Sequence, residues 1–286
     1  MDVLVLGGGP AGATAAIYAA RSGKAVTLVY QDSGALARAE RIENFYGFPA
    51  PISGPDLFRQ GLEQVRSLGV TVKEAQILSL GFGAHGLEAE TTQGTLAAPA
   101  VVLATGAQRR RPRIPGLDDF DGAGVSYCAV CDGFFCRGKE VAVLGAGTYA
   151  LHEAGVLLPL AKRVTLLTNG DPAPEEFPQD LDLDTRPIAA LVGESGILSA
   201  VRFADGGALE VCRLFVALGT AGSGDLARKV GLLTENGKIV VDGTMATSVP
   251  GLFAAGDCTG GLPQVATAVA QGAQAGLSAV RYLQNR

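Results

Sequence analysis

The chain has 286 residues and 48% of them are hydrophobic, which is enough to bury the core of one large or two medium domains. The formal net charge of -5 argues against a general nucleic-acid binder, and no apolar run approaches the ~18 residues of a membrane span. The five cysteines do not look like a secreted disulfide framework and no stretch resembles a signal peptide, so we expect a cytoplasmic protein.

A glycine-rich turn opens the chain. An apolar strand over 3–6 runs into the motif GGGPAG at 7–12, a helix of small residues follows, and a second strand covers 25–30. In such a βαβ unit the first glycine permits the tight turn, the second lets backbone approach a pyrophosphate, and the third lets helix and strand pack closely. The helix N-terminus favours phosphate, so we expect a bound nucleotide rather than a turn without a ligand. Asp32, near the end of the second strand, is the candidate acid for the ribose.

The next elements lead to a linker. The sequence predicts a helix over 54–68, short strands over 71–80 and 87–91, and a buried strand over 99–104 that ends in Thr105 and Gly106. The segment 109–116 is basic, broken by prolines and without a period, which is typical of a linker.

Cys128 and Cys131 are separated by two residues, and Asp132 follows at once. Cysteines at this spacing can close a small disulfide ring, and opening that ring needs electrons and a proton for the leaving thiolate. The adjacent carboxyl is a candidate source of the proton. Because CxxC is also half of a zinc site, the motif becomes specific only through the nucleotide-binding signatures on both sides of it.

A second βαβ unit follows the cysteines. A strand over 140–144, the turn GAGTYA at 145–150, a helix over 149–160 and a strand over 163–167 repeat the opening pattern. Further strands are expected near 189–192, 198–203 and 214–218. A strand from 252 that ends in an acid, Asp257, and a long helix over 264–283 close the chain.

Six motifs together resemble the low-molecular-weight thioredoxin reductase family of flavoenzymes. They are GGGPAG at 7–12, IENFYGFP at 42–49, ATGA at 104–107, CAVCDG at 128–133, GAGTYA at 145–150 and AAGDCTG at 254–260. The resemblance implies an α/β fold of two Rossmann-like, three-layer ββα dinucleotide-binding domains, the second inserted into the first. The implied FAD domain covers 1–113 and 243–286, and the inserted domain covers 114–242. It also implies a homodimer.

The resemblance also assigns roles to single residues. The implied FAD-binding residues are Gly7, Gly9, Pro10, Ala11, Gly12, Asn44, Thr105, Gly106, Gly256, Asp257, Gln264 and Val265. Cys131 would lie next to the flavin ring, Cys128 would attack the partner's disulfide, and Asp132 would be the acid/base. Three of these residues keep a structural alternative, because Asn44 suits a turn, Asp257 a strand-end cap and Asp132 a helix cap.

The second βαβ unit departs from the family pattern. Ordinary members hold NADPH there and neutralise its 2′-phosphate with an arginine cluster, whereas the loop 168–176 carries three acids and no arginine. Tyr149 and His152 stand where the family has small or acidic residues, and Tyr149 can fill the nucleotide's space; the alternative is drift of a structural turn. We therefore expect one FAD per chain and no NADPH. The chain resembles the ferredoxin-dependent flavin thioredoxin reductases, which implies ferredoxin as donor and thioredoxin as acceptor.

Ferredoxins are generally acidic, so a docking surface should be basic. Arg109, Arg110, Arg111 and Arg113 form one candidate cluster, and Arg137, Lys139, Lys162 and Arg163 form another; a solvated linker is the alternative for the first.

Other functions stay open at this point. One is an NADPH-dependent thioredoxin reductase, and another is a diflavin disulfide oxidoreductase with a second FAD in the NADPH-like site. A metal-binding module would use Cys128, Cys131 and Cys136, but it leaves the glycine turns unexplained, and we expect no metal site. Cys136 suits a buried apolar position better than an alternative disulfide with Cys131, and Cys212 and Cys258 are expected to be inert.

Overall fold

The computed structural model describes residues 1–84, 86–106, 112–219 and 221–286. The chain forms two compact units, one made of Met1–Arg109 with Gly222–Arg286 and the other of Arg110–Ala221. The predicted α/β class, with one parallel-sheet unit inserted into another, is confirmed. None of the helices in the described ranges has the length and apolar character needed to cross a membrane.

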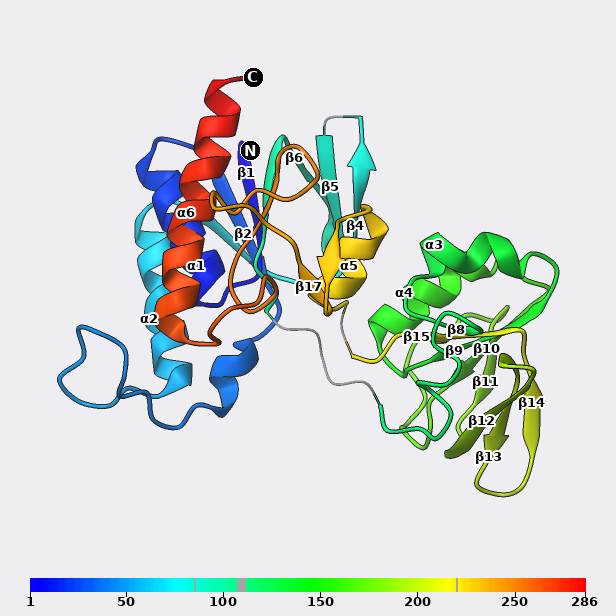
Figure 1. The fold of residues 1–286 in the computed structure, drawn as a ribbon. Helices are drawn as coiled ribbons and strands as arrows, with labels where there is room; N and C mark the ends of the chain where they lie inside the picture. The colour runs from blue at the N-terminus through cyan, green and yellow to red at the C-terminus, as the bar shows by residue number, and fades with distance from the viewer. Residues whose placement is uncertain (85, 107–111, 220) are drawn as a thin grey trace. The chain divides into compact units, whose positions relative to one another are not determined.

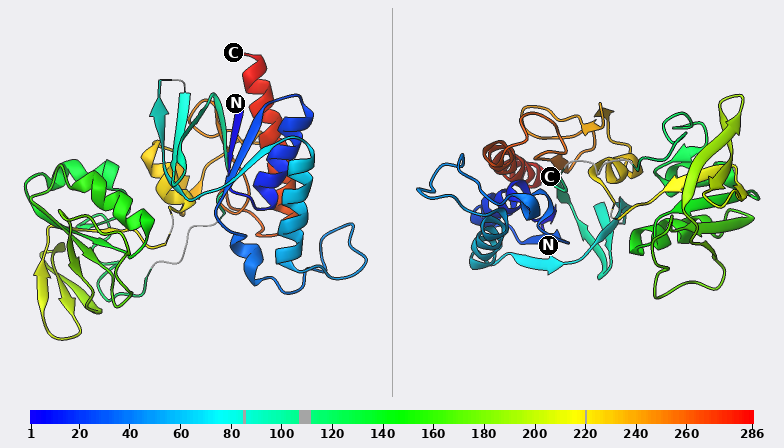
Figure 2. Two further views of the ribbon diagram at one scale, coloured as in Figure 1. Left: turned by 180° about the vertical axis from the view of Figure 1, so that it is seen from behind. Right: turned by 90° about the horizontal axis from the view of Figure 1, so that it is seen from below.

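The first unit is built on a five-stranded parallel sheet in the order β18-β7-β1-β2-β3. Three of its helices, α1, α2 and α6, cover one face, and a three-stranded antiparallel sheet, β4-β5-β6, covers the other (Figures 1 and 2). The strands are β1 Val3–Leu6, β2 Val26–Tyr30, β3 Thr71–Glu74, β4 Ile77–Gly83, β5 Gly86–Thr91, β6 Gly94–Ala98, β7 Ala100–Leu103, β16 Thr234–Glu235, β17 Lys238–Ile239 and β18 Leu252–Ala254. The helices are α1 Pro10–Arg21, the 3-10 helix η1 Gly34–Arg38, α2 Gly54–Ser67, α5 Ser223–Lys229 and α6 Val265–Gln284.

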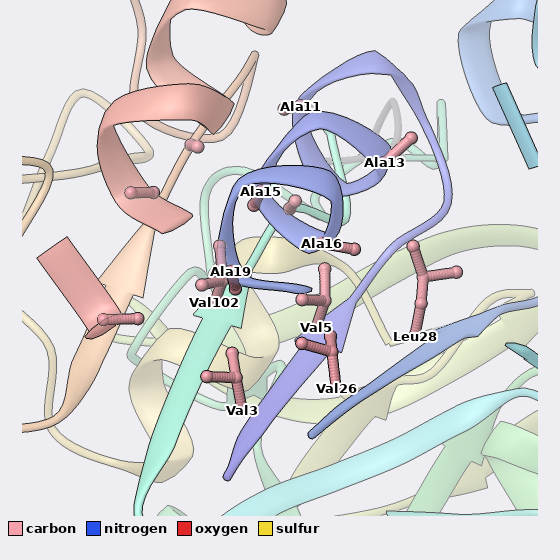
Figure 3. Packing of buried hydrophobic residues seen from close by; sticks show 14 of the residues in the cluster. Val3, Val5, Ala11, Ala13, Ala15, Ala16, Ala19, Val26, Leu28 and Val102 are labelled. Atoms are coloured by element: carbon pink, nitrogen blue, oxygen red, sulfur yellow. The ribbon is translucent and has the colours of Figure 1, made fainter. Parts of the chain in front are cut away.

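Small and branched side chains form the core between this sheet and its helices (Figure 3). All four residues of β1 are fully buried, as expected for a central strand that is covered on both faces. The alanine-rich α1 presents Ala15, Ala16 and Ala19 to the strands, where Val5 and Val102 meet them. Alanine favours the helix and also keeps its axis close to the sheet.

The second unit repeats these layers. Its parallel sheet has the order β11-β10-β9-β15-β8, and β12-β13-β14 form an antiparallel sheet packed against it. The strands are β8 Val125–Ser126, β9 Glu140–Leu144, β10 Arg163–Leu167, β11 Asp182–Asp184, β12 Ile188–Glu194, β13 Ile197–Phe203, β14 Ala208–Glu210 and β15 Arg213–Val216. The helices are α3 Ala129–Asp132, the 3-10 helix η2 Gly133–Cys136 and α4 Thr148–Leu157.

Several boundaries differ from the sequence prediction. The chain returns to the first unit at Gly222, whereas 243 was expected, because α5 packs on β4 and Lys229 donates a hydrogen bond to the Leu78 carbonyl at 3.1 Å. The strand expected over 71–80 is two strands in different sheets, since Ala75 N–H is the last to pair with β2. The helix expected over 149–160 ends at Leu157 in a turn.

Helices α1 and α6 touch through glycine. A Cβ at Gly272 would overlap the Ala11 carbonyl, and a Cβ at Gly276 would lie 2.5 Å from the Ala15 carbonyl oxygen. The two helix backbones therefore pack against each other with no side chain between them, which fixes α1 at the end of β1.

We expect Gly272→Ala to lower the free energy of unfolding by about 1–3 kcal/mol, because the added methyl must push the two helices apart. The measurement is the midpoint of chemical unfolding. Gly61→Ala in α2 is the matched control, since the nearest atom to its added Cβ would be the Ala13 Cβ, at 4.0 Å. We expect this substitution to leave stability unchanged or to raise it. Equal effects of the two substitutions would contradict this account of the packing.

Candidate active site

The first glycine turn has room for a ligand at one position only. Gly7 has φ +115° and its Cβ would overlap the Ala104 carbonyl, while a Cβ at Gly12 would overlap the carbonyl of Gly7. Gly9, in contrast, has no atom within 4 Å of its Cβ position. Two glycines are thus needed by the fold, and the third leaves open space beside the backbone.

Polar groups around this space are left for a ligand. Helix α1 begins after Gly9 with no side-chain cap and no acid in its first turn. Among the described residues, the Thr105 Oγ1 atom is buried without a hydrogen-bond partner. Free N–H groups at a helix N-terminus attract phosphate. The open backbone at Gly9, the uncapped N-terminus and the orphaned hydroxyl fit the pyrophosphate part of FAD.

Segments far apart in sequence meet in this unit. Asn44 Nδ2 donates to Gln264 Oε1 at 2.8 Å, and Gln264 is the N-cap of α6, as expected. Gly256 has φ +85°, its Cβ would lie 3.0 Å from the Ala11 Cβ, and its N–H donates to Gln271 at 2.8 Å. The structure therefore brings the AAGDCTG segment to the start of α1.

The remaining predicted cofactor residues have mixed environments. Val265 packs against the small cluster of Leu36, Ile42 and Ile52. The backbone carbonyl of Asp257 accepts a hydrogen bond from Lys238 Nζ at 2.7 Å. Gly106 has φ +75° and directly follows Thr105, and Pro10 is the first residue of α1.

Asp32 is exposed at the end of β2. Its Oδ1 accepts the Gly34 N–H at 2.7 Å, so the carboxylate shapes the entry to η1. Its role toward a ribose stays a prediction.

Cys128 and Cys131 form a disulfide in the second unit, with Cα atoms 5.3 Å apart. Cys128 is 2% exposed, whereas Cys131 is exposed. Cys128 is the N-cap of α3, and its sulfur accepts the Cys131 N–H at 3.2 Å. A sulfur that accepts a backbone N–H is stabilised as a thiolate when the ring opens.

Two buried side chains that the sequence analysis missed hold this turn. Ala129 N–H donates to Glu153 Oε2 at 2.8 Å, and Cys128 N–H donates to Ser126 Oγ at 3.2 Å. Glu153 is 1% exposed, so a carboxylate in the interior fixes the first turn of the disulfide helix. An acid on the apolar helix α4 was the available signal, because buried acids are rare unless paired.

Asp132 pairs with a cation. Arg213 Nη1 lies 3.2 Å from Asp132 Oδ2, and both side chains are only partly exposed. Arg213 begins β15, so the strand positions the carboxylate that follows the disulfide. Asp132 occupies the N-cap position of η2, but its carboxylate makes no cap hydrogen bond there, and the N-cap of α3 is Cys128.

The second glycine turn keeps the shape of a nucleotide site. Gly145 has φ +152° and its Cβ would overlap the Ala217 carbonyl. Gly147 is the N-cap residue of α4, which has no side-chain cap hydrogen bond. The nearest atom to a Cβ at Gly147 would be the Gly219 carbonyl oxygen, at 3.9 Å. Tyr149 is 1% exposed, so its ring belongs to the packed interior.

The loop after β10 lacks a free guanidinium in its described part. Thr168 and Asn169 are used inside the fold, since Thr168 donates to the Asp171 carbonyl at 2.6 Å and Asn169 accepts the Ile188 N–H at 2.6 Å. Arg186, which follows β11, is engaged by Asp184 and Asp205 and holds the pKa of Asp184 below its usual value. Arg186, the first basic residue after this loop, is thus neutralised by carboxylates, and Arg163, the last basic residue before it, is paired with Asp182 at 2.7 Å.

Comparison with known proteins decides the family. A family model described as pyridine nucleotide-disulphide oxidoreductase matches residues 1–272. A thioredoxin reductase from Aquifex aeolicus is 34% identical, over 100% of this chain and 94% of the relative. This chain is a member of the thioredoxin reductase family.

Solved structures of thioredoxin reductases are also similar to this chain over its whole length. The atypical thioredoxin reductase TRi from Desulfovibrio vulgaris Hildenborough is similar with a TM-score of 0.93 and 38% identity, over 100% of this chain and 98% of that one. A ferredoxin-flavin thioredoxin reductase from Clostridium acetobutylicum is similar with a TM-score of 0.76 and 30% identity, over 100% of this chain and 98% of that one.

We expect Gly9→Val to fold normally and to lose at least tenfold in FAD affinity, because its side chain fills the open space while the backbone at Gly9, with φ -68° and ψ -178°, accepts any residue. The measurement is flavin fluorescence quenching on titration of apoprotein. Gly147→Val, the equivalent change in the second unit, is the control and should leave this affinity unchanged. Full flavin binding by Gly9→Val would contradict the assigned site.

Proposed function

We propose that this protein is a flavin-dependent thioredoxin reductase that passes electrons from reduced ferredoxin to the Cys128–Cys131 disulfide and on to thioredoxin. It is an oxidoreductase of the disulfide-reductase type, consistent with its family. The disulfide at the start of α3 carries the proposal, because it lies in a unit inserted into a dinucleotide-binding fold. We further propose one FAD per chain in the first unit, a cytoplasmic location and a homodimer.

The chain's own groups can perform the exchange. FAD, when bound, supplies two electrons to the disulfide, which becomes two thiols on uptake of two protons. The Cys128 thiolate then attacks the disulfide of oxidised thioredoxin and forms a mixed disulfide, releasing a thiolate that takes a proton. Cys131 attacks Cys128 and frees the second thioredoxin thiolate. Asp132 lies next to Cys131 and is the group that carries these protons.

Exposed apolar residues surround Cys131. Val130, Phe134 and Phe135 are 56%, 67% and 64% exposed. A patch of this kind beside a reactive sulfur suits a protein partner better than a small substrate. It supports thioredoxin as acceptor. Because Cys128 is 2% exposed, the residues that cover its sulfur must move before the incoming disulfide reaches it.

Electrostatics support a donor other than NADPH. A 2′-phosphate at the loop after β10 would meet Asp171, Glu175 and Glu176, while Arg186 is paired with acids. Bidentate arginine pairing is the usual means of holding such a phosphate. The similarity to a ferredoxin-flavin thioredoxin reductase agrees with ferredoxin as the donor.

The structure describes only part of the basic surface expected for ferredoxin. Arg109, Arg110 and Arg111 lie outside the described residues. In the other cluster, backbone bonds join Lys139 to Lys162 and so bring the two segments together. Lys162 pairs with Glu140 at 3.2 Å and Arg163 with Asp182 at 2.7 Å, which reduces the local positive charge.

Anaerobic titration separates the donors. We expect reduced ferredoxin to bleach the flavin rapidly, at a rate that falls with ionic strength, and micromolar NADPH to leave it oxidised. Rapid bleaching by NADPH would overturn the proposed donor and favour an NADPH-dependent thioredoxin reductase.

A diflavin disulfide oxidoreductase is a second candidate, because the turn at Gly145 and Gly147 keeps an uncapped helix N-terminus. The ratio of FAD to protein tests it. One FAD per chain supports the leading proposal. Two per chain, falling to one in Gly147→Val, would replace it.

We expect Asp132→Asn to slow thioredoxin reduction by roughly 10²-fold or more, because the amide keeps the shape but moves no proton. Flavin reduction by ferredoxin should not change. Cys128→Ser is the reference, with no thioredoxin turnover and a flavin that is still reduced. Full turnover in either variant would contradict the assigned roles, and stopped-flow absorbance with a thioredoxin turnover assay measures both steps.

A further inference from the structure

Two cysteines outside the active disulfide lie together in the second unit. Cys136, the last residue of η2, and Cys212, which precedes β15, are near enough for the Cys212 thiol to perturb the Cys136 thiol. Backbone bonds lead from one to the other, since Lys139 N–H donates to the Cys136 carbonyl and Cys212 N–H donates to the Glu140 carbonyl. Both are free thiols when Cys128 and Cys131 are paired.

The two thiols have different access to solvent. Cys136 is fully buried, and its thiol donates to the Asp132 carbonyl at 3.7 Å. Cys212 is half-buried and lines an open, shallow depression of about 430 Å³ between β9, β13 and β14. A small reagent can therefore reach Cys212 before it reaches the buried Cys136.

Acid–base chemistry also disfavours Cys136 as the first of the two thiols to react. Burial, with Cys212 as the next cause, raises the pKa of Cys136 to about 11. Cys136 thus stays a thiol at neutral pH and does not react first, because the thiolate is the nucleophile. Cys212 carries the initial reaction, and Cys136 is placed to close the bond.

We propose that Cys136 and Cys212 form a second redox site, oxidised by hydroperoxides to a disulfide. The Cys212 sulfur takes one oxygen from the peroxide, giving a sulfenic acid and, from hydrogen peroxide, water. The Cys136 thiol attacks that sulfur; a sulfur–sulfur bond forms, and the hydroxyl leaves as a second water with the thiol proton. One peroxide and two thiols thus give one disulfide and two waters.

The second redox site is connected to the active disulfide through shared segments of the chain. Cys136 and Cys212 connect η2 with the start of β15, and Asp132 and Arg213 connect the same two segments at 3.2 Å. Oxidation removes the thiol proton that the Asp132 carbonyl accepts. We expect slower thioredoxin reduction in the oxidised enzyme, a consequence that rests on the proposed function, whereas the pairing itself does not.

The test uses the folded holoenzyme with its Cys128–Cys131 disulfide intact. Hydrogen peroxide is added, remaining thiols are alkylated, and peptides are mapped by mass without reduction. Before peroxide we expect free thiols at Cys136, Cys212 and Cys258. After peroxide we expect a free thiol at Cys258 alone and a peptide in which Cys136 and Cys212 are linked. Cys258 should stay reduced because it is buried and its pKa is raised to about 12, mainly by burial.

Two variants make the test specific. Cys212→Ser should keep Cys136 free after peroxide treatment, and Cys258→Ser, the matched control, should still form the linked peptide. Three thiols that survive peroxide, a Cys212 oxidised without a partner, or a Cys131–Cys136 link would each overturn the proposal. Because thiol pairing is measured directly, failure of thioredoxin reduction would not be mistaken for failure of this site.

Discussion

Close contact between backbones is the constraint on which both units depend. In the first unit the Cβ-free sites at Gly7 and Gly12 bring β1, β7 and α1 into contact, and Gly272 brings α6 onto α1. Any side chain at these positions would separate the layers by the size of a methyl group or more. The uncapped N-terminus of α1 lies beside Thr105 only because no side chain separates the helix from the strands at Gly7 and Gly12. The dinucleotide site therefore follows from this close packing of backbones.

The parts of the site that depend on local sequence could be predicted. The glycine turn, the start of α6 after Gln264 and the paired Cys128 and Cys131 each have a short-range pattern with a physical reason. The supports could not be predicted, because Glu153, Arg213 and Cys212 lie 24, 81 and 76 residues from their partners Ala129, Asp132 and Cys136. The return at Gly222 was missed for a similar reason, since contacts of α5 with β4 have no local signature.

The second unit keeps the backbone shape of a nucleotide site, whereas the positive charge that would bind a phosphate is neutralised. Its turn at Gly145 and Gly147 keeps the form that admits a dinucleotide, while Arg186, the first arginine after the loop 168–176, is held by Asp184 and Asp205. Fold geometry is stabilised by the core and persists without a ligand, whereas a phosphate site needs uncompensated positive charge. The same unit can therefore keep its architecture and change its electron source.

The insertion of Arg110–Ala221 into the first unit affects the order of events during synthesis. The inserted unit is continuous in sequence and can form its sheet as soon as β15 has left the ribosome. The first unit must wait, because β18 and α6 complete its sheet and helix layer and come last in the chain. Nascent chains thus have a structured thiol-bearing unit before the sheet of the first unit is complete, so loading of flavin comes after the inserted unit has formed.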